Sequence, residues 1–451
     1  MKKHEILYDW LHSYITTLAD SAVAESFSEN LAKERQNNFA QLTEELRLHS
    51  AELIKAKASR LHFGNWRALW DNFSKFADDF NDFPDLVTKK VQLTIIIASK
   101  LAGDQVSLDL KNIDETLFEI RDLEISPPLK WFVWQNSRSL VDSVVVFSCA
   151  DILALAADIP ATNISPELGF QFLAALIRLP DITSKHAALI KKTNPSIADK
   201  AVDAFARLAL VSDGKAVHQP RQYKLVPQIF DRDAVKAGIA YHQFNDIFDV
   251  LSEYNSRSEI LTKYLTLYHV IENFMFKLPI VRLERQKNGD MFSIRDFRNM
   301  YSKVSDTEAD AINKAILKLL DYELSPGHTF KSRVVATWNK LLPANAPVGR
   351  AAAIQGVLGA LGLTERDVPL THAQFRTNLG SNLARVIYGI RNAVVHNKAT
   401  EFHLTYATLT GAFCLIIEEF LVPVLEEICF ALISNKNDYV WYSNERLVLY
   451  G

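Results

Sequence analysis

The sequence predicts a mainly α-helical protein. Gly and Pro, which most often mark turns, number only 15 each among 451 residues, and this favours helices over sheets. Apolar residues recur at helical spacing in long stretches near both ends of the chain. A chain of this length exceeds one ordinary core. We therefore expect a helical domain at residues 1–160, a small α+β domain at 161–235 and a helical domain at 236–451.

The first domain is expected to be a series of helices. It is acidic on balance from residue 61 to 126, which fits either a solvated helical scaffold or a domain that binds a protein partner or senses a signal. The expected helices span residues 4–20, 25–57, 66–80, 84–101 and 130–157.

The middle of the chain shows a different pattern. Helices are expected at 167–179, 184–192 and 196–210, and two strand-like runs follow, around Asp213-Gly214 and Gln219-Pro220. Three helices and a hairpin resemble a winged helix-turn-helix. The third helix would carry Asp199 and Asp203 against Lys200 and Arg207, which is poor chemistry for a polyanionic groove. A protein-contact or spacer role is therefore favoured over DNA reading.

The last part of the chain returns to helical periodicity. Ser305 followed by Glu308 has the spacing of a capping box at the start of one helix. Residues 371–395 are expected to form a long helix with an apolar stripe along one face. Residues 404–434 are expected to form a very apolar helix that closes the domain. Further helices are expected at 259–278, 305–320 and 349–361, and a terminal β-hairpin at 440–442 and 447–450.

The motif with the clearest chemistry is Ile-Arg-Asn-Ala-Val-Val-His-Asn, residues 390–397, at the end of the 371–395 helix. A histidine can move a proton on or off a ribose 2′-hydroxyl. A guanidinium can hold a phosphate as negative charge builds on it. Arg391 and His396, with Asn392 beside them, therefore have the chemistry to cleave RNA without metal or cofactor.

An arginine five to seven residues before a histidine is a weak pattern by itself, because chance supplies it. The chain contains it twice, as Arg391 with His396 and as Arg366 with His372. The second pair spans Pro369 in a connection between helices, whereas Arg391 lies on a packed helix that would fix its side chain. We therefore retain only the first pair.

Helix geometry adds a constraint. Residues five apart on a continuous helix point about 140° away from each other, so Arg391 and His396 would not share a face. Asn392 and His396, four apart, would share one. The pair therefore requires a helix end near Val395, an arginine that bends across Asn392, or a second subunit that completes the site.

A helix, the Ile-Arg-Asn-x-x-x-His-Asn motif and a long apolar helix together resemble the HEPN superfamily over about residues 236–435. The segment from Tyr268 to Asn273, with polar residues inside an apolar run, fits the same family. The resemblance implies a four-helix bundle in which Arg391 and His396 are the catalytic pair of a metal-independent endoribonuclease, with Asn392 beside them. It also implies a homodimer that brings two motifs together, and a toxin or anti-phage setting. This chain departs from a minimal domain by a long insertion at 279–370.

The insertion and its flanks are basic, with 13 Lys and Arg against 8 Asp and Glu from Lys277 to Arg350, while the whole chain has a formal net charge of −3. Basic groups near aromatic rings can follow a phosphate backbone and stack bases. A solvated loop with a few packed rings is the alternative. The expected RNA-binding residues are Arg282, Arg285, Lys287, Arg295 and Arg298.

Two residues upstream, His269 and Glu272, are expected to orient the motif as neighbours of the catalytic pair, or else to be polar groups satisfied inside the bundle. The three cysteines have no zinc-ligand spacing, so no metal or other cofactor is expected. The first residues lack the apolar run of a signal peptide, and no run is long enough to span a bilayer. A cytoplasmic location without membrane association is expected.

The function that the sequence favours is cleavage of RNA by attack of the 2′-hydroxyl, in a homodimer that binds RNA. The first alternative is a non-catalytic bundle that uses the motif for dimerisation or another protein interaction. The second is a winged-helix regulator that binds DNA, against which the acidic third helix counts.

Overall fold

The computed structural model divides into two compact units, Met1–Gln219 and Pro220–Gly451. Both are rich in helices, and the first also contains a small antiparallel sheet, so the mainly α fold with an α+β segment is confirmed. No helix among the described residues is long and apolar enough to cross a membrane. The structure describes residues 1–109, 111–136, 139–152, 155–156, 164–182, 184–191, 199–223, 235–286, 293–296, 298, 307–364, 372–396 and 402–443.

The first unit begins with five helices that share one apolar core. Their buried faces contribute leucines, isoleucines and a dense set of aromatic rings that includes Phe39, Phe76 and Phe80. The helix expected at 25–57 is divided in two, because the chain turns at Asn30. The helices are α1 (Lys3–Asp20), α2 (Ala22–Glu29), α3 (Lys33–Ser59), α4 (Trp66–Asp79) and α5 (Thr88–Gly103).

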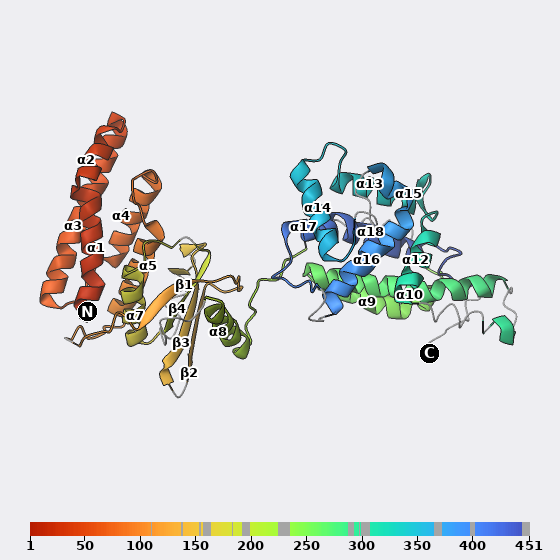
Figure 1. The fold of residues 1–451 in the computed structure, drawn as a ribbon, viewed down its shortest axis with the longest axis horizontal. Helices are drawn as coiled ribbons and strands as arrows, with labels where there is room; N and C mark the ends of the chain where they lie inside the picture. The colour runs from red at the N-terminus through yellow and green to blue at the C-terminus, as the bar shows by residue number, and fades with distance from the viewer. Residues whose placement is uncertain are drawn as a thin grey trace. The chain divides into compact units, whose positions relative to one another are not determined.

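A four-stranded antiparallel sheet follows, in the order β1-β4-β3-β2. Helix α7 (Pro166–Ile177) covers one face and helix α8 (Asp199–Ser212) packs on the other (Figure 1). The strands are β1 (Phe118–Asp122), β2 (Trp131–Asn136), β3 (Ser139–Ser148) and β4 (His186–Lys191).

The sheet corrects two helix predictions. Residues 130–157 contain strands β2 and β3, and the run at 184–192 contains β4, which pairs with β1 and β3 on its two sides. Both runs are rich in buried apolar residues, and a short apolar run fits a covered strand as well as a helix. Since the sheet combines strands from both sides of residue 160, no boundary between compact units lies there.

The winged-helix pattern is not what the described residues show. Between 166 and 223 they contain two helices and the strand β4, and the residues after α8 form only isolated bridges, such as Ser126 with His218. On α8 the charges of Asp203 and Arg207 pair with each other within the helix, because Arg207 Nε donates to Asp203 Oδ2 at 2.7 Å. Apolar residues of the same helix, such as Val202 and Ala206, pack on the sheet.

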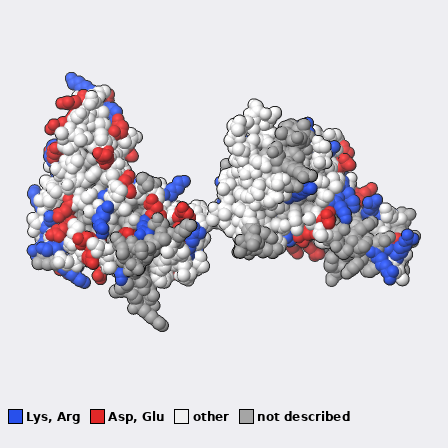
Figure 2. All heavy atoms as spheres, in the orientation of Figure 1, with Lys and Arg blue, Asp and Glu red and all other residues white. Residues whose placement is uncertain are grey.

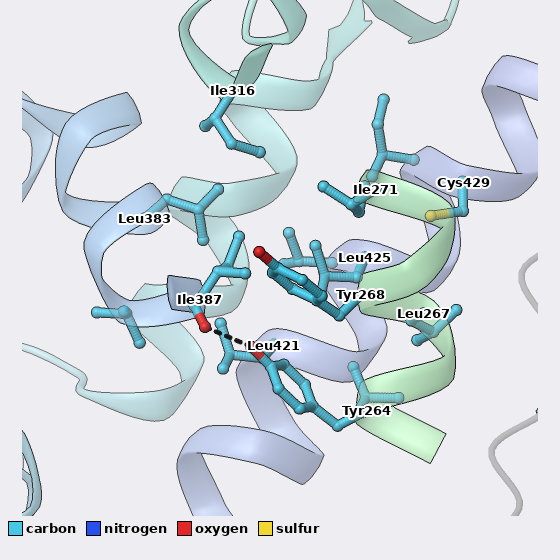
Figure 3. Close-up of a cluster of buried hydrophobic side chains, with 14 of the residues drawn as sticks. Tyr264, Leu267, Tyr268, Ile271, Ile316, Leu383, Ile387, Leu421, Leu425 and Cys429 are labelled. Carbon is cyan, nitrogen blue, oxygen red and sulfur yellow. Dashed lines mark hydrogen bonds between the residues drawn. The ribbon is translucent and has the colours of Figure 1, made fainter. Parts of the chain in front are cut away.

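The second unit has one large apolar core. Helices α10, α12, α16 and α18 all contribute to it, and Figure 3 shows the cluster in which Tyr264, Tyr268, Leu383 and Leu425 meet. The helices around this core are α9 (Asn245–Ser256), α10 (Ile260–Gln286), α12 (Glu308–Leu319), α13 (Phe330–Leu341), α14 (Val348–Ala360), α15 (His372–Thr377), α16 (Leu379–Val395), α17 (Gly411–Cys414) and α18 (Val422–Ser434), with the 3-10 turn η3 (Tyr241–Phe244) and the two-stranded ribbon β5 (Glu323–Ser325) and β6 (His328–Thr329).

The described part of the long insertion beyond residue 307 belongs to this core. It contributes α12, α13 and α14, and Trp338 of α13 stacks on Phe375 at 3.9 Å between ring centroids. Residues 305 and 306 lie outside the described residues, and the N-cap of α12 is Thr307, whose hydroxyl accepts from the Asp310 N–H. Glu308 is therefore the first residue of the helix and not the partner of a Ser305 cap.

The closing helix contains a widened segment. Residues Leu415–Leu421 form the π-helix η4 between α17 and α18. Pro423 follows it and has no N–H to donate to the carbonyl of Glu419, four residues back, and its ring would crowd that carbonyl. A widened turn at this point lets the helix pass the proline without ending. Residues Leu404–Thr410 precede the first helical turn, so the expected helix starts later than predicted. Residues 447–450 of the expected terminal hairpin lie outside the described residues, and 440–442 form no strand.

Candidate active site

The helix that carries the motif ends near Val395, as the catalytic hypothesis requires. Helix α16 finishes at Val395, and His396 has extended backbone angles (φ −93°, ψ 123°) while its N–H still donates to the Asn392 carbonyl at 2.9 Å. The chain thus turns immediately before the histidine side chain. The first of the three predicted geometries, a helix end near Val395, is confirmed.

This helix end brings the three motif side chains together. Arg391 Nη1 lies 3.0 Å from Asn392 Oδ1 and 3.0 Å from His396 Nε2. A guanidinium has only donors, so Nε2 must accept the hydrogen bond and the imidazole proton must lie on Nδ1. The histidine is therefore neutral while the contact persists, with its acceptor nitrogen directed at the arginine.

Two residues from other helices complete the cluster. Arg391 Nη2 forms an ion pair with Glu308 Oε1 of α12 at 3.0 Å, with side chains 17% and 26% exposed. The hydroxyl of Tyr268 on α10 donates to the same carboxylate oxygen at 2.5 Å. The guanidinium carbon of Arg391 also lies 5.6 Å from the centroid of the Tyr268 ring, within cation–π range. Burial, and then the neighbouring carboxylate of Glu308, raise the pKa of the Tyr268 phenol.

Sequence reasoning missed Glu308 as part of this cluster. A carboxylate in the first turn of a helix is stabilised by the helix dipole. This local role explains Glu308 in the sequence without any contact to Arg391. Only the packing of α12 against α16 brings it to Arg391, and that packing depends on the whole core.

The two residues expected to orient the motif have other positions. His269 is exposed on α10. Glu272 is half-buried one turn after Tyr268, and its charge adds to the rise in the pKa of that tyrosine. Within the described chain, neither residue hydrogen-bonds to Arg391, Asn392 or His396. The carboxylate that pairs with Arg391 is Glu308 instead.

The predicted RNA-binding arginines separate into two kinds. Arg285 is anchored inside the unit, where its guanidinium pairs with Asp438 at 2.7 Å and donates to the carbonyls of Asn437 and Trp441 at 3.1 Å each. Arg282, Arg295 and Arg298 are exposed.

Arg282 lies near the end of α10, and Figure 2 shows blue Lys and Arg atoms gathered at that end of the unit. Arg282 is fourteen residues after Tyr268 on the same helix, a rise of about 21 Å. Any RNA that touches both regions would have to extend along α10. Lys287 lies outside the described residues, as does Arg366 of the second Arg–His pair.

The cluster thus holds one guanidinium, one imidazole, one carboxamide, one carboxylate and one phenol within direct contact. Such a set can bind a phosphate, accept a proton and stabilise added negative charge. Comparison of this chain with protein-family models, with curated proteins and with solved structures finds no match.

Proposed function

We propose that this protein is a metal-independent endoribonuclease. The observation that carries the proposal is the direct contact between Arg391 and His396 at the end of a rigid, packed helix. The resemblance of the motif to the HEPN superfamily adds the expectation that two copies act as a dimer, in a toxin or an anti-phage effector.

The reaction begins when the ribose 2′-oxygen attacks the adjacent phosphorus. The Arg391 N–H that donates to His396 Nε2 first turns to the phosphate. Nε2 then accepts the proton of the 2′-hydroxyl. The guanidinium stabilises the negative charge on the phosphorane, and the bond from phosphorus to the 5′-oxygen breaks. The products are a 2′,3′-cyclic phosphate and a 5′-hydroxyl, whose proton comes from water or from the histidine of the second copy.

The test is cleavage of a fluorescent single-stranded RNA in EDTA by purified wild type, His396→Ala and a control, His328→Ala. His328 is exposed on the short β-ribbon of the same unit. We expect wild type and the control to cleave equally, His396→Ala to lose at least about 100-fold, which is the contribution typical of acid–base catalysis, and the products to carry cyclic phosphate ends. Equal cleavage by wild type and His396→Ala, or activity that requires a metal ion, would contradict the proposal.

One observation favours a second candidate function, a non-catalytic interaction module. Arg391 joins α16 to α12 through Glu308, and to the Tyr268 ring on α10, so the arginine also links three helices. If that is its whole role, wild type has no RNA cleavage, and Arg391→Ala lowers the melting temperature or dissociates the dimer while His396→Ala does neither.

A further inference from the structure

Two tyrosines on α10, one helical turn apart, both direct their hydroxyl groups to the surroundings of Arg391. We propose that Tyr264 and Tyr268 are positioning residues for this arginine, the first for its backbone and the second for its side chain. This inference rests on the ribonuclease function proposed above. Neither tyrosine needs to touch the RNA for this role.

Tyr264 acts on the backbone of α16. The ring and hydroxyl are fully buried, and the hydroxyl donates to the carbonyl of Ile387 at 2.5 Å (Figure 3). The carbonyl of Ile387 is also the one that the N–H of Arg391 meets in an ordinary helix. The phenol therefore binds α16 one turn before Arg391 and fixes the turn from which Arg391 projects.

Tyr268 acts on the side chain through Glu308. Its hydroxyl donates to Glu308 Oε1, the oxygen that pairs with Arg391 Nη2, and its ring lies against the guanidinium. A carboxylate that accepts from two fixed donors has little freedom to rotate. The guanidinium is therefore held on one side by Glu308 and on the other by Asn392 and His396, before any phosphate binds.

Satisfying a buried hydroxyl does not by itself explain this arrangement. A buried phenol needs one partner, and Tyr322 in the same core has one in the carbonyl of Ala431, at 3.0 Å. The hydroxyls of Tyr264 and Tyr268 instead both reach partners of a single catalytic candidate, from consecutive turns of one helix. Tyr322 is the natural control, because its hydroxyl donates to a carbonyl of α18 that is not a partner of Arg391 among the described residues.

The experiment compares Tyr264→Phe, Tyr268→Phe and the control Tyr322→Phe in the full-length protein. Cleavage of the RNA probe gives kcat and KM, thermal melting gives stability, and NMR of carbon-labelled histidine gives the environment of His396, identified by the signal lost in His396→Ala. We expect the first two variants to lose about 10-fold or more in kcat, as misplacement of a catalytic group does, with KM within threefold. Both should shift the His396 signal, and the control should do neither.

The two parts of the experiment separate the inference from the proposed function. If wild type fails to cleave RNA, the proposed function fails, and with it the catalytic meaning of the tyrosines. A His396 signal shifted by both tyrosine variants, and not by the control, would still show that they position the motif. Positioning is overturned if the signal is unmoved in Tyr264→Phe and Tyr268→Phe, or if Tyr322→Phe loses kcat equally at equal stability.

Discussion

Arg391 connects chemistry with stability, because its guanidinium is the cation that balances the partly buried carboxylate of Glu308. Arg391→Ala leaves that carboxylate with the Tyr268 hydroxyl but without its charge partner. We expect a loss of about 1.5–3 kcal/mol in the free energy of unfolding, the usual contribution of a hydrogen bond to a charged group. Denaturant unfolding measures it.

A double-mutant cycle provides the control for this prediction. Glu308→Ala and Arg391→Ala together should cost less than the sum of the two single changes, by at least about 0.5 kcal/mol, since they share one interaction. Strictly additive losses would mean that the ion pair contributes nothing to folding.

Lys277 offers a prediction about pH. Its ammonium is buried against the rings of Phe244 and Tyr442, at 3.8 and 4.9 Å, and donates to the carbonyl of Gln243 at 2.8 Å. Burial lowers its pKa from 10.5 to about 8, and the charge of Asp246 offsets this only in part.

The folded protein therefore binds fewer protons than the unfolded chain between pH 8 and 10.5. The free energy of unfolding consequently receives a contribution from Lys277 that increases with pH over this range, by about 3 kcal/mol at most. Lys277→Met should flatten this rise, so unfolding curves of both proteins at pH 7.5 and 9.5 provide the measurement. The same pH dependence in wild type and variant would show that the lysine is not the source.

At the scale of elements, the contact between α12 and α16 determines whether Glu308 reaches the motif. Gly380 of α16 lies against the C-terminal part of α12, and a Cβ added there would meet Leu317 at 2.7 Å and Leu320 at 3.1 Å. Gly380→Ala should cost about 1–3 kcal/mol through overpacking. It should also reduce cleavage, because it displaces the helix that carries Glu308.

Gly389 is the matched control on the same helix. A Cβ there meets nothing closer than Leu363 at 3.5 Å, which is ordinary contact. Gly389→Ala should therefore stabilise the protein by about 0.5–1 kcal/mol, the gain of alanine over glycine in a helix. Equal melting temperatures of the two variants would contradict the proposed close approach at Gly380.

The elements also show where sequence reasoning succeeds and fails. Long amphipathic runs, such as α1 and α4, were predicted within a few residues, because a single stripe of buried residues defines them. The short run at β4 was predicted as a helix, since Ala, Leu and Lys favour helices locally. Its strand form depends on β1 and β3 on either side, which are distant in sequence.

The candidate site shows the same division. Arg391, Asn392 and His396 are near neighbours in sequence, so the motif alone predicts that they act together. Helix periodicity leaves open whether a helix end, a bent arginine or a second subunit brings the arginine to the histidine. Glu308 and the two tyrosines come from other helices, and nothing local in the sequence indicates that they meet Arg391. Arg285 lies in a basic stretch with aromatic residues, which is typical of a nucleic-acid contact. Its guanidinium is instead bound by the chain segment that packs against α10.

For the whole molecule, the division at Gln219 and Pro220 leads to a prediction about independence. The two units have separate hydrophobic cores, and the second begins with its own anchor, where the Arg221 guanidinium donates to both oxygens of Glu418 at 2.8 and 3.1 Å. We expect residues 220–451 to fold alone, with one cooperative thermal transition, and to retain cleavage of the RNA probe.

This prediction has a direct counter-result. A fragment of residues 220–451 that unfolds gradually, or that lacks the transition seen in the full chain, would show that the second unit needs the first to fold. A folded fragment with altered cleavage would assign a regulatory role to residues 1–219. Circular dichroism and the RNA assay together distinguish these outcomes.

The origin of the site in separated segments has a consequence for the order of events during synthesis. Tyr264 and Tyr268 leave the ribosome long before Arg391 and His396, and Glu308 appears between them. Contacts between such distant segments form late, after the loops that join them have closed. A nascent or truncated chain that has α10 and α12 but lacks α16 therefore carries the two tyrosines and the Glu308 carboxylate without the Arg391 guanidinium that they contact in the folded protein. The cleaving activity proposed here would therefore appear only when the last of the three helices docks.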